Sequence, residues 1–99
     1  MQLCDLTIHQ LKSLLEKKEV TAEEILDSCL MRIREVEPDV RAFITVLEDS
    51  AKNAARTIDK NGHYQGLSGI PCGLKDIFCT RGIKTTCASR MLENFIPNY

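Results

Sequence analysis

The sequence lacks an apolar run near the ~20 residues that a membrane-spanning helix needs. Its first residues, 1–5, contain neither a basic stretch nor an apolar core, so we expect no signal peptide. These absences predict a cytoplasmic protein without membrane contact. The formal net charge is −1 at pH 7, and the basic residues are scattered. Neither a nucleic-acid-binding face nor affinity for anionic lipid is indicated.

Motifs for metals and nucleotides are missing as well. The chain has no C-x-x-C pair, and its two histidines, His9 and His63, lie far from any pair of cysteines, which argues against a zinc site. No P-loop pattern occurs, so we predict neither a metal ligand nor a cofactor-binding residue in this chain. An odd cysteine count without an export signal favours free thiols. We expect two of the five cysteines, Cys29 and Cys72, to be buried as small apolar residues.

A serine-based catalytic set is also absent. None of the serines lies in a Gly-x-Ser-x-Gly elbow. His63 falls in a polar loop with no acid at a useful spacing, so it is not assigned as a base.

The first part of the chain carries clear helix signals. Thr7 with Gln10, and Thr21 with Glu24, have the spacing of capping boxes, and an apolar stripe follows each pair. Only a few residues separate the two stripes, which predicts a helical hairpin over about 7–37. We expect the second helix to end near Pro38, because proline disfavours helix in the residue before it.

The next part predicts alternating strands and helices. The apolar, β-branched run 42–47 predicts a buried strand, 50–60 a third helix and 69–78 a second strand, with a brief third strand at 83–86 and a short helix at 88–93. The fold class is therefore α/β, a mixed sheet flanked by helices, with strand-helix-strand over about 42–78. Such a sheet would have open edges, so we expect residues 1–99 to be the N-terminal part of a larger, truncated domain.

One lysine, Lys75, interrupts the second expected strand, which runs Gly69-Ile70-Pro71-Cys72-Gly73-Leu74-Lys75-Asp76. An amine buried among apolar side chains tends to lose its proton and can then act as a base. The pattern alone also fits a surface lysine at the end of a strand. Gly73 lies on the same face of the expected strand and leaves room for a partner of Lys75.

These residues resemble a known family. Gly69-Ile70-Pro71-x-x-Leu74-Lys75-Asp76 resembles the lysine motif of the amidase signature family. The stretch from Cys79 to Phe95 is similar to the branch of that family formed by the A subunits of glutamyl-tRNA(Gln) amidotransferases. The resemblance covers the whole chain and only the N-terminal part of the family's domain.

The resemblance implies a function and partners. The implied enzyme hydrolyses glutamine and supplies ammonia for converting Glu-tRNA(Gln) to Gln-tRNA(Gln), together with the B and C subunits of the amidotransferase. ATP, magnesium and most tRNA contacts belong to the B subunit in that scheme. Two alternatives remain open: an amidase of the same family that acts alone, and a non-catalytic fragment or interaction module.

The resemblance also implies a catalytic role. The family uses a serine nucleophile, a second serine and a lysine, and Lys75 is the residue that matches the lysine. Asp76 is expected to support or orient the site. The two serines belong to a Gly-Ser-rich stretch that is not among these 99 residues, so we expect the chain alone to be inactive. Ile77-Phe78 and Asn98 depart from the family pattern without touching the lysine.

Overall fold

The structure is a computed structural model, and it describes residues 2–99. In chain order its elements are η1 (Leu3–Asp5), α1 (Ile8–Glu16), α2 (Ala22–Val40), α3 (Glu48–Asn61) and η2 (Arg90–Leu92), where η marks a short 3₁₀ helix. The chain divides into two compact units. The first unit comprises the residues up to Arg41 and Leu47–Pro71, and the second comprises Ala42–Val46 and Cys72–Tyr99.

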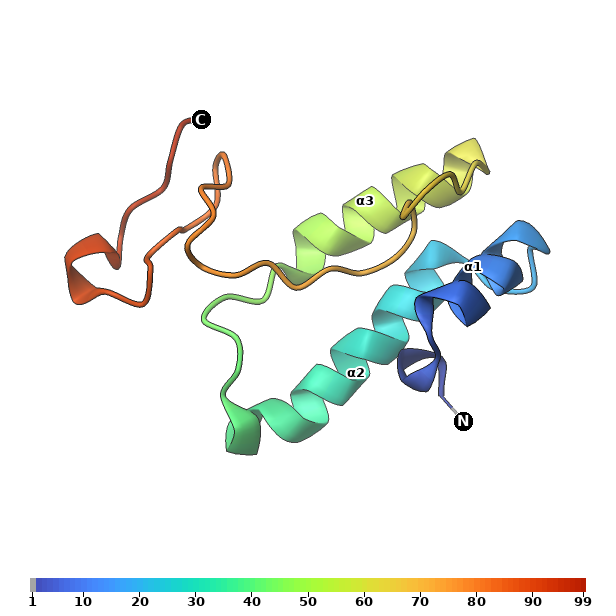
Figure 1. The fold of residues 1–99 in the computed structure, drawn as a ribbon, viewed down its shortest axis with the longest axis horizontal. Helices are drawn as coiled ribbons and strands as arrows, with labels where there is room; N and C mark the ends of the chain where they lie inside the picture. The colour runs from blue at the N-terminus through green and yellow to red at the C-terminus, as the bar shows by residue number, and fades with distance from the viewer. Residues whose placement is uncertain (1) are drawn as a thin grey trace. The chain divides into compact units, whose positions relative to one another are not determined.

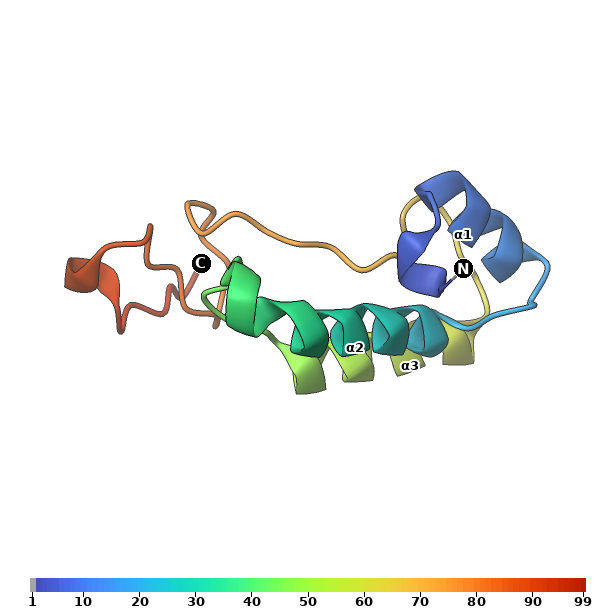
Figure 2. The ribbon, with the colours of Figure 1, turned by 90° about the horizontal axis from the view of Figure 1, so that it is seen from below.

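The first unit holds all three α-helices. Figure 1 and Figure 2 show α2 and α3 running side by side, with the short α1 against the beginning of α2. One apolar cluster lies between α2 and α3, and a second joins α1 to α2. No helix among the described residues is both long and apolar enough to cross a membrane.

Both predicted capping boxes are confirmed. The Thr7 N–H donates to Oε1 of Gln10 at 2.9 Å, and the Gln10 N–H donates back to the Thr7 hydroxyl at 3.2 Å. Thr21 and Glu24 exchange the same pair of bonds at the start of α2, at 3.4 and 3.1 Å. Each box satisfies two of the N–H groups that the first turn of a helix leaves unpaired.

The expected end of the second helix at Pro38 is wrong by a short distance, because α2 continues to Val40. Proline this close to a helix terminus removes only its own N–H from the ladder. The next turn still closes, since the N–H of Arg41 donates to the carbonyl of Glu37 at 2.8 Å. Arg41 then ends the helix in the left-handed conformation, with φ of 52°.

The core of the first unit is built from the predicted stripes. Two side chains, Leu15 and Ile25, are fully buried. Tyr64, from the loop after α3, packs against both apolar clusters and so connects them. The other buried apolar residues of this unit are Leu11, Ala22, Leu26, Leu30 and Ala55.

A single carboxylate from α3 completes the start of α2. Asp59 accepts hydrogen bonds from the N–H of Ala22 at 2.7 Å and from the N–H of Glu23 at 3.0 Å. With the Thr21–Glu24 box, all four unpaired N–H groups of the first turn of α2 then have side-chain acceptors. The hydroxyl of Tyr64 also donates to Asp59, at 2.8 Å. Partial burial of the ring, followed by this contact with a carboxylate, raises the pKa of Tyr64.

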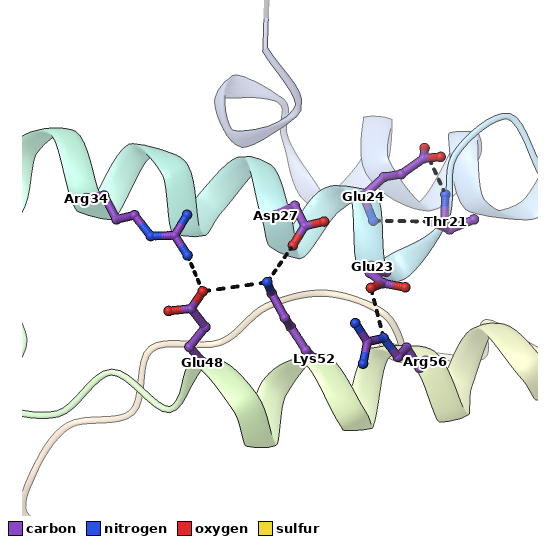
Figure 3. A network of polar contacts seen from close by, with 8 residues as sticks. All are labelled: Thr21, Glu23, Glu24, Asp27, Arg34, Glu48, Lys52 and Arg56. Carbon is purple, nitrogen blue, oxygen red and sulfur yellow. Dashed lines mark hydrogen bonds and ion pairs between the residues drawn. The ribbon is translucent and has the colours of Figure 1, made fainter.

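Ion pairs mark the outer edge of the α2–α3 contact (Figure 3). Glu23 pairs with Arg56 at 2.9 Å. Lys52 lies between two acids, Asp27 of α2 at 3.7 Å and Glu48 of its own helix at 3.6 Å, and Glu48 also contacts Arg34. The α2 partners ascend in number as the α3 partners descend, which is the register of antiparallel helices. Exposed pairs of this kind contribute about 0–1 kcal/mol each, so they specify register more than stability.

The second unit has no strand, and neither has the rest of the described chain. The expected strands at 42–47, 69–78 and 83–86, and with them the mixed sheet, are therefore absent from this structure. A strand needs a neighbouring strand for its backbone groups. Here turns take up many of them: the N–H of Phe78 donates to the Lys75 carbonyl at 3.1 Å, and that of Ile83 to Thr80 at 3.0 Å. The short helix expected at 88–93 forms only as η2.

Loss of the Asp59 carboxylate should destabilise the helix pair. We expect Asp59→Ala to lower the free energy of unfolding by about 2–3 kcal/mol, because it removes an N-terminal cap and leaves polar groups unpaired. Faster hydrogen exchange at the Ala22 and Glu23 amides would locate the effect. Asp39→Ala, at an exposed site near the end of α2, is the control. Equal effects of both substitutions would contradict the assignment.

Gly69 should tolerate alanine poorly. It has φ of +89°, and a Cβ there would lie 3.2 Å from Cδ1 of Leu15 and 3.3 Å from Cδ1 of Tyr64. We expect Gly69→Ala to cost about 2–4 kcal/mol, from the left-handed backbone and from crowding. Gly66→Ala is the matched control, because φ is +58° but no atom lies within 4 Å of the added Cβ. Urea unfolding followed by helical circular dichroism should show the smaller loss for Gly66→Ala.

Candidate functional site

Lys75 lies in the second unit, in irregular backbone at the start of a turn. Its side chain is exposed and makes no hydrogen bond or ion pair within the described part of the chain. The strand expected to carry Lys75 does not form, and the exposed side chain agrees with the alternative of a surface lysine. The reason is the missing sheet, because without paired strands no apolar layer covers this segment. The predicted space at Gly73 is present, since the nearest atom to an added Cβ is Cε1 of Phe43 at 3.9 Å.

Asp76, directly after Lys75, has a side chain that accepts several hydrogen bonds. Its carboxylate accepts from the N–H of Thr86 at 2.8 Å, from the Thr86 hydroxyl and from the N–H of Ala88 at 3.1 Å. Its main-chain carbonyl accepts from the N–H of Cys87 at 3.0 Å. The structure thus ties the residue after Lys75 to 86–88, a segment some ten positions later in the chain.

The neighbouring threonine, Thr85, acts on the other end of the same turn. Its hydroxyl lies 3.4 Å from the carbonyl of Phe78, and the hydroxyl of Thr80 lies 3.3 Å from the same carbonyl. Thr85 and Thr86 are only 3% and 6% exposed, in a unit whose other side chains are mostly open to solvent. Neither threonine was predicted from the sequence as a site residue. A Thr-Thr pair after a turn was the only signal, and it does not say what the hydroxyls bind.

The hydrogen bonds fix the ionisation of Asp76. The Thr86 hydroxyl, then the N–H groups of Thr86 and Ala88, lower the pKa of the Asp76 carboxyl below its ordinary value. The charged form is therefore favoured in the folded turn. Backbone strain accompanies this arrangement, since Cys87 and Ala88 have φ of 50° and 55°, in the left-handed region.

A shallow hollow of about 440 Å³ lies in the same unit, and Lys75 does not line it. Two cations, one acid and several hydroxyls line it together with apolar atoms, and it is open rather than a closed catalytic pocket. Its lining residues are Ile44, Thr45, Lys84, Thr86, Ala88, Ser89, Arg90 and Glu93.

A second hollow, of about 470 Å³, lies in the first unit beside α1. It contains His9, Ser13 and Glu16, residue types that could form a serine-based relay. No hydrogen bond joins any two of these three side chains in the described residues, so no relay exists there.

The cysteines are free thiols in this structure. Cys29 is half-buried, and burial, with a smaller contribution from nearby Cys4, raises its pKa. Cys72 is exposed, so the expectation that it is buried is wrong, again because no sheet covers its segment. Residues 2–99 hold no group of three or more side chains that could bind a metal ion.

Comparison with known proteins assigns this chain to a family. Residues 24–99 match the model of the family described as Amidase. The chain belongs to the amidase family. The motif around Lys75 lies within the matched region, and the resemblance proposed from the sequence is confirmed.

Several relatives of this chain share one name. Proteins named as the A subunit of glutamyl-tRNA(Gln) amidotransferase, from Syntrophomonas wolfei and Geotalea daltonii, are 54% and 55% identical to this chain over 99 and 102 aligned residues. A third, from Caldanaerobacter subterraneus, is 50% identical over 102 residues. Each alignment covers 100% of this chain and 20–21% of the relative. The chain thus spans about a fifth of the length of these relatives.

The Asp76 contacts should weaken in acid. Because the folded pKa is lowered, their stabilisation is complete above the unfolded value, near 3.9, and is lost as the pH falls through the lower folded value. We expect hydrogen-exchange protection of the Thr86 and Ala88 amides to be constant at neutral pH and to fall in that acidic window. Asp76→Asn should remove this pH dependence. Unchanged protection of both amides at a pH well below the window would contradict the assignment.

Proposed function

We propose that this chain forms part of a glutamine-hydrolysing amidase, one that supplies ammonia for converting Glu-tRNA(Gln) to Gln-tRNA(Gln). The observation that carries the proposal is the 50–55% identity, over the whole chain, to proteins named as the A subunit of that amidotransferase. Membership of the amidase family agrees with amide hydrolysis as the reaction. In this proposal the protein works in the cytoplasm with the B and C subunits of the amidotransferase, and the B subunit uses ATP and magnesium.

Lys75 is the catalytic residue that we assign to this chain. In the proposed reaction the neutral amine of Lys75 takes a proton from the hydroxyl of one serine. That serine takes a proton in turn from the hydroxyl of a second serine, and the second serine attacks the glutamine amide. Both serines belong to other parts of the full-length protein, so these 99 residues alone do not hydrolyse glutamine. The motif position supports the assignment, and the Asp76 contacts hold the adjacent main chain.

The exposure of Lys75 sets a condition on this proposal. In the described residues the amine has neither the apolar cover nor the hydroxyl partner that a lysine base needs. The remaining four fifths of the full-length protein must therefore cover Lys75 and bring a hydroxyl to it. A non-catalytic role of the segment is the alternative that exposure favours, and an amidase acting without partners is the alternative that the family match alone permits.

Substitution of Lys75 tests the assignment in the full-length protein assembled with its partners. We expect Lys75→Ala and Lys75→Arg to lower the rate of glutamine hydrolysis by roughly 10²–10⁴-fold, because guanidinium does not give up its proton at working pH. Lys60→Ala, an exposed lysine near the end of α3, should leave the rate unchanged.

The pattern of results separates the alternatives. Full activity of Lys75→Arg with inactive Lys75→Ala would mean that Lys75 supplies only positive charge. Full activity of both would support a non-catalytic segment. Equal hydrolysis of glutamine without the B and C subunits, and no product from Glu-tRNA(Gln) when they are added, would favour an amidase that acts alone.

A further inference from the structure

If the amine of Lys75 acts as the base, its position depends on a fixed main chain at that residue. The lysine side chain is a flexible four-carbon stem, so its amine reaches a defined place only if the backbone that carries it is held. Misplacement of a reacting group by about 1 Å can cost about 10²-fold in rate. The contacts that hold the turn 75–78 therefore bear on catalysis although they do not touch the amine of Lys75.

Two neighbouring threonines contact this turn. Thr86 binds the carboxylate of Asp76 through both its N–H and its hydroxyl. The hydroxyl of Thr85, the residue before Thr86, lies 3.4 Å from the carbonyl of Phe78 and 3.3 Å from that of Ile83. The turn itself closes between these two points, through the bond from the Phe78 N–H to the Lys75 carbonyl.

The two threonine side chains are buried and hydrogen-bonded, which indicates that the fold holds them in defined positions. Thr85 and Thr86 are the buried polar residues among those described, while Lys75 and the apolar side chains around it are exposed. Burying a hydroxyl is costly unless it is hydrogen-bonded, and both hydroxyls are. No buried side-chain nitrogen or oxygen atom in the described residues lacks a partner.

We propose that Asp76 and Thr86 are positioning residues, which fix the main chain at Lys75 through the contact of the Thr86 hydroxyl with the Asp76 carboxylate. The hydroxyl of Thr85 lies beside the far end of the same turn. This inference rests on the proposed role of Lys75 as the base. It adds that the rate depends on a contact that neither the substrate nor the lysine amine makes.

The test uses the full-length protein assembled with its partners and measures kcat and KM for glutamine. Thr86→Val removes the hydroxyl and keeps both the side-chain shape and the N–H. We expect kcat per folded enzyme to fall roughly 10- to 100-fold, with KM changed by less than about twofold. Thr86→Ser restores the hydroxyl and should recover most of the rate. Thr57→Val, at an exposed site on α3, is the matched control and should behave as the unsubstituted enzyme.

A second arm separates positioning from a merely structural role. If Thr86 acts through Lys75, then Thr86→Val should add less than about twofold to the loss already caused by Lys75→Ala, since residues that act as a unit are not additive. A structural role would lower the residual rate by the same factor in both backgrounds. If Thr86→Val does not assemble, Asp76→Asn takes its place in both arms, with Asp39→Asn as its control.

The outcomes distinguish this inference from the proposed function. Inactive Lys75→Ala with fully active Thr86→Val and Asp76→Asn would overturn the positioning role and leave Lys75 as the base. Additive losses, or failure of Thr86→Ser to recover the rate, would also overturn it. Full activity of Lys75→Ala would overturn the base assignment and the positioning role together.

Discussion

The carboxylate of Asp59 is the interaction on which the first unit depends. It binds two N–H groups at the start of α2 and accepts the hydroxyl of Tyr64, so one charged group of α3 connects a second helix and a loop. Tyr64 in turn packs against both apolar clusters. A carboxylate is well suited to this place, because the first turn of a helix presents unpaired N–H groups and a positive dipole end. The exposed ion pairs along the same contact help to set the register of α2 against α3.

A second carboxylate organises the other unit by the same principle. Asp76 gathers backbone N–H groups from 86–88, much as Asp59 gathers those of α2. Neither unit uses a β-ladder within the described residues. Where apolar burial is scarce, a charged acceptor with several N–H donors can hold an irregular segment, since charge-assisted hydrogen bonds are stronger than neutral ones. The segment that follows the candidate base is held in this way.

The family assignment and the geometry bear on different parts of the function. The amidase match and the named relatives support amide hydrolysis and the proposed transamidation role. The structure shows that Lys75 is exposed and begins a turn that the Asp76 contacts hold in place. The exposed position of Lys75 contrasts with the catalytic role that the family match suggests. A base needs cover and a hydroxyl partner, and neither comes from the residues described. In our proposal the Asp76 contacts hold one half of the site, and the other half comes from the rest of the full-length protein.

Local signals in the sequence determined the helices and the family. Thr7, Gln10, Thr21 and Glu24 specify their capping boxes by spacing alone, because these contacts join residues three positions apart. The strand predictions failed because a strand depends on a distant partner, and a run of apolar residues does not show whether one is present. The contacts of Asp59 with Ala22 and of Asp76 with Thr86 span 37 and 10 positions, and only the tertiary structure decides them. A carboxylate can accept from any N–H that the fold brings near, so its partners cannot be found from spacing.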